Sequence, residues 1–400
     1  MPTVKVPLFS GVYKGADGIE LTDDQAELMD AYLGELQQTV KRPGLTSLIT
    51  LDTGSAAVNG LYWWDEKSLA IITSNGRTYK ITRTGSLSNP SFASTDLTGT
   101  SLTVGQTTFA TDGTYVFMAA GGRIGYTDGT TTTALVADAD APTTVTHVAW
   151  LDGYVLANNL NNRFYWSDVN NSLSWGALNF ASAEGASDSI SALHVWDREI
   201  YLFGRRSLEI WENDGSTPFS RVSGGFKSSG CEAPYSIART RTAAYWLNDE
   251  RRFVSFAGRS IEPIAPGMNR EVQRLSKVDD CIASTVLCDG YTFVIFNFPT
   301  ANRTFVYNEN NETWSEWGAF DSSTGLYDRF AAANIKYAQG WGITLAGSNT
   351  GPLVYKLSSD VYSDASPIRV RRLTGLIDYG TLKLKRSNQL RLRVKRGQGL

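Results

Sequence analysis

Residues 199–212 read Glu-Ile-Tyr-Leu-Phe-Gly-Arg-Arg-Ser-Leu-Glu-Ile-Trp-Glu, two apolar and aromatic runs on either side of a short polar turn. Runs of this composition are typical of β-strands. Seven such pairs occur along the chain, roughly every 40 to 50 residues. The first runs are Ser68–Thr73, Thr114–Ala120, Gly153–Asn159, Glu199–Gly204, Thr242–Asn248, Tyr291–Phe298 and Trp341–Gly347. The second runs are Arg77–Thr82, Arg123–Asp128, Arg163–Asp168, Arg206–Glu212, Arg252–Gly258, Arg303–Glu309 and Pro352–Leu357.

A repeat of short strands and polar turns at this period indicates an all-β fold, the β-propeller, in which neighbouring blades bury each other's apolar faces. The sequence therefore predicts one propeller over residues 46–360. The number of blades is expected to be six or seven, because an end repeat can be shared to close the ring. The residues expected on inner strands are Leu69, Ile71, Val116, Phe117, Val155, Tyr201, Trp246, Phe293 and Ile295.

The composition suits a large soluble β protein. The chain has 400 residues, of which 42% are hydrophobic, and 37 glycines supply turns. Met1–Ser10 lacks the apolar stretch of a secretory signal, so we expect a protein that is made and used without export. Three cysteines without metal-ligand spacing are expected to be reduced, buried thiols.

The two ends of the chain differ from the repeat region and from each other. Residues 1–45 are predicted to form an N-terminal arm with a short helix, because Thr22 and Gln25 fit a capping box and Ala26, Leu28, Met29, Tyr32 and Leu33 form a partial apolar face. Residues 361–400 are predicted to form a small basic β domain. Its expected strands are Ile368–Ile377 and Leu382–Arg396, which alternate apolar and basic residues.

Charge is divided unequally between these ends. The last 35 residues hold ten basic side chains and one acidic one, a local charge of +9 in a chain of net charge −3. Gly15–Val40 holds seven acidic side chains and no basic one. Complementary ends suit subunits that pack in a ring or column, although solvated ends would also explain the pattern.

Several motifs resemble one protein family. They are Lys41-Arg42-Pro43-Gly44-Leu45, Phe164-Tyr165-Trp166-Ser167-Asp168 with Trp175 and Asn179-Phe180, Asp188-Ser189-Ile190, the segment Tyr201–Trp211, Gly224-Gly225, Gly230–Pro234, Thr374-Gly375 through Thr381, Lys385–Ser387 and Lys395–Gly397. Their order and spacing resemble the tail-hub or nozzle proteins of short-tailed, podovirus-type bacteriophages, also described as packaged-DNA stabilisation proteins. Family members usually continue through a fuller C-terminal β domain, so the last sheet here is expected to be truncated or completed by another chain.

The resemblance implies a structural component of the virion, assembled in the host cytoplasm. It implies a homo-hexameric ring below the portal and adaptor proteins, in contact with a tail needle or plug and with tail fibres or spikes. Double-stranded DNA would pass through the ring without sequence-specific contacts. No small-molecule substrate, cofactor or metal is expected.

The basic C-terminal residues are the predicted interface with neighbouring subunits or other tail proteins. A channel lined with them would hold DNA phosphates tightly and oppose release, since affinity grows with each neutralised phosphate. The channel wall is therefore expected to be neutral or acidic. The predicted interface residues are Arg369, Arg371, Arg372, Lys383, Lys385, Arg386, Arg391, Arg393, Lys395 and Arg396, with Asp23, Asp24 and Glu27 as acidic partners.

Two other functions were weighed. A propeller glycosidase needs paired carboxylates, and Asp188 with Glu209 or Glu309 with Glu312 are possible pairs. No complete set of base, nucleophile and oxyanion donors has usable spacing, so a non-enzyme is predicted. A carbohydrate-binding propeller would use exposed aromatic residues, but the tryptophans keep no common register and are expected to fill the core. They include Trp63, Trp64, Trp166, Trp175, Trp211, Trp246, Trp314 and Trp317.

Overall fold

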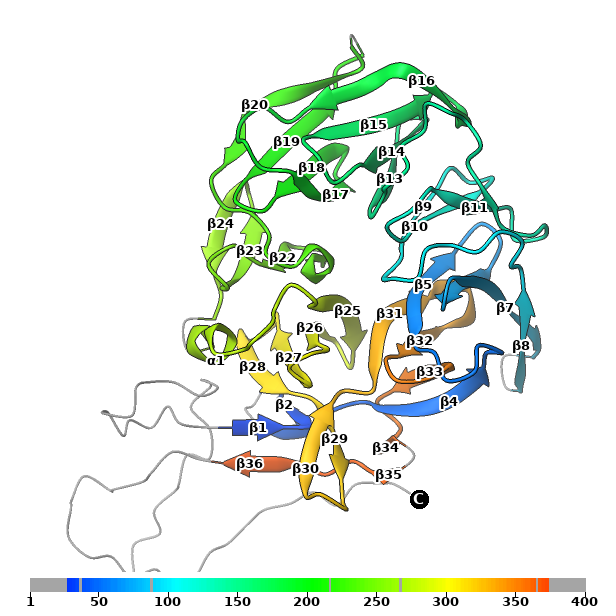
Figure 1. The fold of residues 1–400 in the computed structure, drawn as a ribbon. Coiled ribbons are helices and arrows are strands. Elements are labelled where there is room, and N and C mark those ends of the chain that lie inside the picture. Colours follow the sequence, from blue (N-terminus) through cyan, green and yellow to red (C-terminus); the bar gives the residue numbers. More distant parts are fainter. Residues whose placement is uncertain are drawn as a thin grey trace, which may run out of the picture.

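The computed structural model describes residues 27–373 except for 36–37, 87–88, 216, 266–267 and 365. Seven antiparallel sheets are arranged around a common centre, so the fold is a seven-bladed β-propeller (Figure 1). This confirms the predicted fold class and decides between six and seven blades.

Blades 1 to 5 each consist of four consecutive strands. Blade 1 contains β5 (Val58–Trp64), β6 (Leu69–Ser74), β7 (Arg77–Gly85) and β8 (Pro90–Asp96). Blade 2 contains β9 (Thr108–Thr111), β10 (Val116–Ala119), β11 (Gly125–Thr127) and β12 (Ala134–Leu135). Blade 3 contains β13 (Val148–Leu151), β14 (Tyr154–Asn158), β15 (Arg163–Asp168) and β16 (Asn171–Ser182). Blade 4 contains β17 (Ile190–Trp196), β18 (Glu199–Gly204), β19 (Leu208–Asn213) and β20 (Phe219–Lys227). Blade 5 contains β21 (Ala238–Arg239), β22 (Ala244–Leu247), β23 (Phe253–Ala257) and β24 (Ser260–Pro263).

Blades 6 and 7 are extended by strands from the chain ends. Blade 6 contains β25 (Ile282–Cys288), β26 (Tyr291–Phe298), β27 (Arg303–Asn308) and β28 (Thr313–Glu316), followed outward by β1 (Glu27–Met29) and β36 (Arg371–Leu373). Blade 7 contains β31 (Ala332–Ala338), β32 (Ile343–Ser348) and β33 (Leu353–Ser358), followed by β4 (Gly44–Thr50), β34 (Ser363–Asp364) and β35 (Ser366–Pro367).

Strand β4 closes the ring. It supplies the fourth strand of blade 7 and pairs antiparallel with β33, so that Leu45 lies opposite Leu357. The first blade-forming strand of the chain therefore completes the last blade. The sharing of an end repeat, foreseen as one way of closing the ring, is what the structure shows.

The seven predicted pairs of runs are the second and third strands of the blades, not the innermost ones. All nine residues expected on inner strands lie instead in second strands, namely in β6, β10, β14, β18, β22 and β26, where they are buried. The second strand has blades packed on both faces and reads as a continuous apolar run. The innermost strands are half exposed and carry weaker patterns.

Seven apolar clusters hold neighbouring blades together, one at each of the seven junctions. Phe203 of blade 4 meets Trp246 of blade 5 at a ring separation of 5.2 Å, and Phe253 of blade 5 meets Phe296 of blade 6 at 4.5 Å. Full burial of each such side chain is worth about 1.5 to 3 kcal/mol. The ring is stable only when every blade has its neighbours.

Hydrogen bonds between neighbouring blades that involve the innermost strands add to this packing. Asn158 Nδ2 donates to the carbonyl of Ile190 (3.4 Å) across blades 3 and 4, and Ile335 N donates to Ser284 Oγ (3.2 Å) across blades 7 and 6. Asn334 Nδ2 donates to the carbonyl of Val58 (3.2 Å), which ties blade 7 to blade 1.

The connections contain few helices. The described helices are the 3-10 turns η1 (Pro234–Ser236) and η2 (Gln339–Trp341) and the α-helix α1 (Asn269–Gln273). Within the described residues, no helix has the length and apolar character needed to span a membrane.

The helix predicted near the N-terminus is wrong where the structure describes the chain. Residues 27–33 form β1 and β2 (Ala31–Leu33), separated by Asp30 at a positive φ of 57°. Strand β1 runs parallel to β28, with Met29 opposite Glu316, and antiparallel to β36. The apolar spacing mimicked a helix face, but sheet pairing with distant strands determines the local structure.

The two histidines of the chain lie together near the inner strands. The ring of His147 stacks on Tyr235 (5.1 Å) and meets His194 (5.4 Å), which stacks on Trp196 (5.3 Å). Burial lowers the pKa of His194 to about 4, with a further contribution from Lys336. Burial, and then His194, lower the pKa of His147 well below its ordinary value. Both rings are therefore neutral at pH 7.

Acidification is expected to destabilise this cluster. The unfolded chain takes up protons near pH 6.5, whereas folded His194 does so only near pH 4. The stabilising contribution is thus present above pH 6.5 and is lost as the pH falls toward 4, at up to about 1.4 kcal/mol per pH unit for each proton. Urea unfolding at several pH values checks this. A His194→Phe variant should show a shallower dependence between pH 6.5 and 4, and an equal slope would contradict the assignment.

Candidate partner-binding platform at the chain ends

The first and last described segments of the chain and one hairpin lie beside blades 6 and 7 (Figure 1). We call this part the terminal platform: residues 27–43, 318–329 and 360–373. Besides β1, β2 and β34 to β36, it contains β3 (Thr39–Lys41) and the hairpin of β29 (Gly318–Asp321) and β30 (Leu326–Arg329). The chain leaves the regular blade pattern here, so the platform is the candidate site for contacts with other proteins.

Arg42 lies at the centre of the terminal platform and is almost fully buried. Its Nε donates to Asp30 Oδ1 (2.6 Å), and its Nη2 donates to Asp364 Oδ2 (2.5 Å) and to the carbonyl of Gly318 (2.7 Å). Its Nη1 donates to the carbonyl of Pro43 (3.0 Å). One guanidinium therefore fastens the N-terminal strands, the β29–β30 hairpin and the C-terminal strands together.

Arg42 and Asp30 are both buried, so the Asp30 carboxylate relies on the Arg42 guanidinium as its charged partner. The guanidinium carbon lies 4.8 Å from the ring centre of Phe330, and the carboxylate of Asp30 is sealed from solvent. Burial raises the pKa of Asp30, and the charge of Arg42 opposes that rise. Burial works to lower the pKa of Arg42, but the carboxylates of Asp30 and Asp364 outweigh it and raise that pKa. The pairing with Arg42 offsets part of the cost of burying the Asp30 carboxylate.

The basic C-terminal strand is paired with the acidic N-terminal strand of the same chain. Arg371 forms an ion pair with Glu27 (3.1 Å), and Arg372 donates to Thr39 Oγ1. The guanidinium of Arg369 lies 4.2 Å from the ring centre of Phe320 in the hairpin. These three arginines thus hold the platform together, and Glu27 serves as an acidic partner within its own chain.

The terminal platform also exposes apolar side chains. Leu326 is 69% exposed, and Tyr362, Val370 and Leu373 are each at least 40% exposed. An apolar surface beside three arginines is typical of a surface that contacts another protein. The platform thus places exposed apolar side chains beside the three arginines.

The remaining predicted interface residues lie outside the described part of the chain. They are Asp23, Asp24, Lys383, Lys385, Arg386, Arg391, Arg393, Lys395 and Arg396. Most of the predicted C-terminal β domain lies there too. Its described beginning, Arg371–Leu373, is strand β36 of the blade 6 sheet.

Three of the four carboxylates named above as possible catalytic pairs, Asp188, Glu209 and Glu309, have structural partners. Asp188 accepts hydrogen bonds from Arg206 N (2.7 Å) and Ser207 Oγ (2.7 Å). The buried Glu209 accepts from Gly185 N (2.6 Å) and Trp211 Nε1 (3.0 Å), and Glu309 accepts from Tyr245 (2.9 Å). Among the described residues, no group of three or more His, Cys, Asp or Glu could hold a metal ion.

The tryptophans weighed as sugar platforms fill the blades. Trp64, Trp246 and Trp317 are fully buried, and Trp211 is half-buried. The other four named above are buried as well. Sequence reasoning missed Arg42, Asp30 and Asp364 as a unit. The available signal was Arg42 in the Lys41–Leu45 motif, but a partner 322 positions away cannot be identified from one sequence.

The fold and the platform define a closed, seven-bladed propeller in which strand β1 near the N-terminus pairs with strand β36 near the C-terminus on one side of the ring. A family model described as bacteriophage P22 Gp10, β-propeller, matches residues 6–362. The chain belongs to this family, and it is a phage DNA-stabilisation propeller protein associated with the virion. A family of phage structural proteins also favours a non-enzyme.

Solved structures show the same architecture. The extracellular domain of a hybrid two-component system from B. thetaiotaomicron superposes with a TM-score of 0.52 at 15% identity, covering 79% of this chain and 40% of that one. The chain therefore spans less than half the length of that protein. The WD40 β-propeller domain of Doa1 has a TM-score of 0.43 at 14% identity, covering 79% and 97% of the two chains. The first of these likenesses shows the fold alone. No curated protein sequence matches the chain.

Proposed function

We propose that this protein forms the hub or nozzle ring of a short phage tail, through which the genome leaves the capsid and by which the packaged DNA is retained. The observation that carries the proposal is the family match over residues 6–362, which covers the four inner strands of every blade. In this role the chain acts mechanically, as a rigid wall element rather than as a catalyst.

The structure gives this role a physical basis. Seven apolar junctions and inter-blade hydrogen bonds make each copy a stiff body, which suits a conduit that must hold its shape under pressure. The terminal platform offers one contact surface, with exposed Leu326, Val370 and Leu373. We propose that platforms contact neighbouring copies in a homo-hexamer, or the portal, adaptor, plug and fibre proteins.

The basic residues from Arg369 to Arg396 are proposed to face neighbouring subunits or other tail proteins, which leaves a neutral or acidic channel wall. DNA then passes without a clamp of neutralised phosphates.

Electron microscopy of the purified full chain tests the assembly. We expect rings of several copies, six in the proposed hexamer, with a central hole wide enough for duplex DNA. A reconstruction of the assembled tail should place the basic residues away from the lumen. Monomers without ring formation, or arginines and lysines aimed at DNA phosphates, would contradict the proposal.

A further inference from the structure

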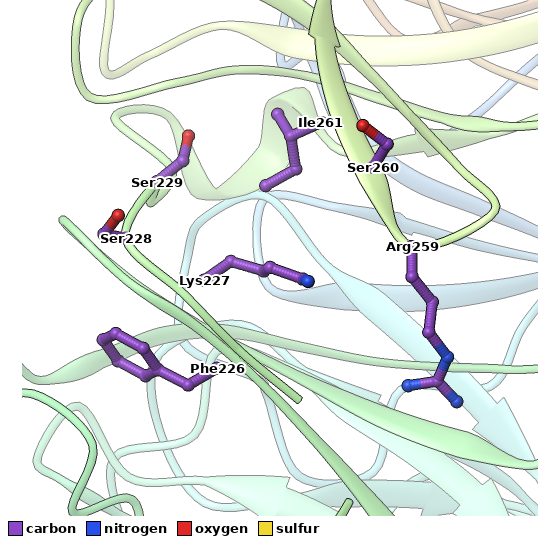
Figure 2. Close-up of a pocket in the computed structure, with 7 residues that line it drawn as sticks. All are labelled: Phe226, Lys227, Ser228, Ser229, Arg259, Ser260 and Ile261. Atoms are coloured by element: carbon purple, nitrogen blue, oxygen red, sulfur yellow. The ribbon is translucent and has the colours of Figure 1, made fainter. Parts of the chain in front are cut away.

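A hollow of about 410 Å³ lies between the outer strands of blades 4 and 5. Figure 2 shows the side chains of Lys227 and Arg259 extending into the same region, with Phe226 below and Ile261 across from it. The lining is completed by Ser228, Ser229 and Ser260. It therefore combines two cations and three hydroxyls with two apolar side chains.

A β-bulge in the pairing of β19 with β20 shapes the wall of the hollow that carries Phe226 and Lys227. The pairing of β19 with β20 shifts register between Glu209 and Trp211, next to Gly224 at φ +69°. A Cβ on Gly225 would lie 2.8 Å from two backbone oxygens, so only glycine fits there. The bulge re-aims Phe226, whose ring packs so closely on Gly185 that a Cβ there would lie 2.5 Å from it. Phe226 is thus a fixed, partly exposed aromatic surface.

The opposite wall carries Arg259 in an uncommon backbone conformation. Its φ is +66°, in the left-handed region where glycine or asparagine is usual. Its guanidinium is held by an ion pair with Glu199, and Ser260 donates its hydroxyl to Glu262 (2.6 Å). The guanidinium of Arg259 has further N–H groups that can donate hydrogen bonds to a ligand, since a guanidinium carries five donors.

Two polar groups in the wall lack a partner within the described residues. Within the described part of the chain, Lys227 has no ion-pair partner. Ser229 Oγ is shielded from solvent and has no hydrogen-bond partner there. Shielded hydroxyls in folded proteins are normally bonded. A ligand with acceptor atoms in the hollow would satisfy Lys227 and Arg259 together.

We propose that this hollow receives the acidic segment 15–26 of a second copy of the chain. The segment reads Gly-Ala-Asp-Gly-Ile-Glu-Leu-Thr-Asp-Asp-Gln-Ala, with four carboxylates and no basic residue. Its carboxylates match Lys227 and Arg259, and its Ile19 and Leu21 match Phe226 and Ile261. The inference rests on the proposed assembly of several copies, and gives Asp23 and Asp24 a receiving site.

Zero-length cross-linking of the full chain tests this contact. Equal amounts of unlabelled and ¹⁵N-labelled protein are mixed, reacted with a carbodiimide that joins lysine amines to carboxylates, and analysed by mass spectrometry. We expect Lys227 joined to Glu20, Asp23 or Asp24, in pairs that carry one label from each copy. Lys227→Glu should abolish this product and weaken self-association about tenfold.

Control variants separate the possible outcomes. Lys227→Arg removes the reactive amine but keeps the charge, so cross-linking should vanish while self-association persists. Lys277→Glu, at an exposed lysine outside the hollow, should leave both unchanged. Oligomers without a Lys227 cross-link, or cross-links only within one copy, would overturn the inference and leave the assembly standing. A chain that neither assembles nor cross-links would count against both.

Discussion

Replacing Arg42 by methionine is expected to lower the free energy of unfolding by about 3 to 5 kcal/mol, the usual cost of leaving a buried charge without its partner. Methionine fills the space beside Phe330, so lost packing contributes little. What is lost is the pairing of the guanidinium with Asp30 (2.6 Å) and Asp364 (2.5 Å). Urea unfolding measures the total, and hydrogen exchange at residues 27–33 shows whether the terminal platform opens first.

A matched arginine and a double variant make the result specific. Arg198 is 77% exposed and pairs with Asp152, so Arg198→Met should cost under about 1 kcal/mol. Adding Asp30→Asn to Arg42→Met should recover part of the loss, because the uncompensated carboxylate is then gone. If Arg42→Met costs no more than Arg198→Met, the buried network is not what holds the platform.

A proline at Thr46 is expected to destabilise the ring by about 3 kcal/mol, since a strand bond is lost and its partner is left unpaired. Thr46 lies in β4 opposite Lys356, and β4 has strand neighbours on both sides. Thr46→Pro should lower the melting temperature and expose blade 7 to limited proteolysis, because the closing strand no longer pairs with β33.

Thr95 provides the control for this change. It is also an exposed threonine opposite a lysine, Lys80, but it lies in β8, the outermost strand of blade 1. Proline is tolerated better at such an edge, so Thr95→Pro should cost under about 1 kcal/mol. Equal losses from the two prolines would mean that β4 does not carry ring closure.

The repeat made the propeller predictable, but only through its best-buried strands. The second and third strands of each blade have blades packed on both faces, and their apolar runs are visible in the sequence. The innermost strands are short or half exposed, as in β21 with two residues and β13 with four, and leave little pattern. At the N-terminus, the four-residue spacing of Leu28 and Tyr32 fits one face of a helix. In the structure the two residues lie in separate strands, β1 and β2, and pack in different apolar clusters.

The platform was harder to predict than the blades. Opposite charges at the two ends suited packing between subunits or solvated ends, whereas the pair of Glu27 with Arg371 is a contact within a single chain. The network around Arg42 left no comparable signal. Its members are a turn residue, a carboxylate at positive φ and an aspartate near the other end, and only the closed ring brings them together.

Because β4 closes the ring, it is synthesised long before the strands with which it pairs. Asp364, which accepts a hydrogen bond from the backbone of Leu45, follows it by 319 positions. At 5 to 20 residues per second, a ribosome needs roughly 15 to 60 s to cover that distance. Throughout this interval β4 has emerged, but the strands that pair with it have not been synthesised. The nascent chain therefore carries an open strand edge for most of its synthesis, and crowded ribosomes on one message bring such edges close to each other.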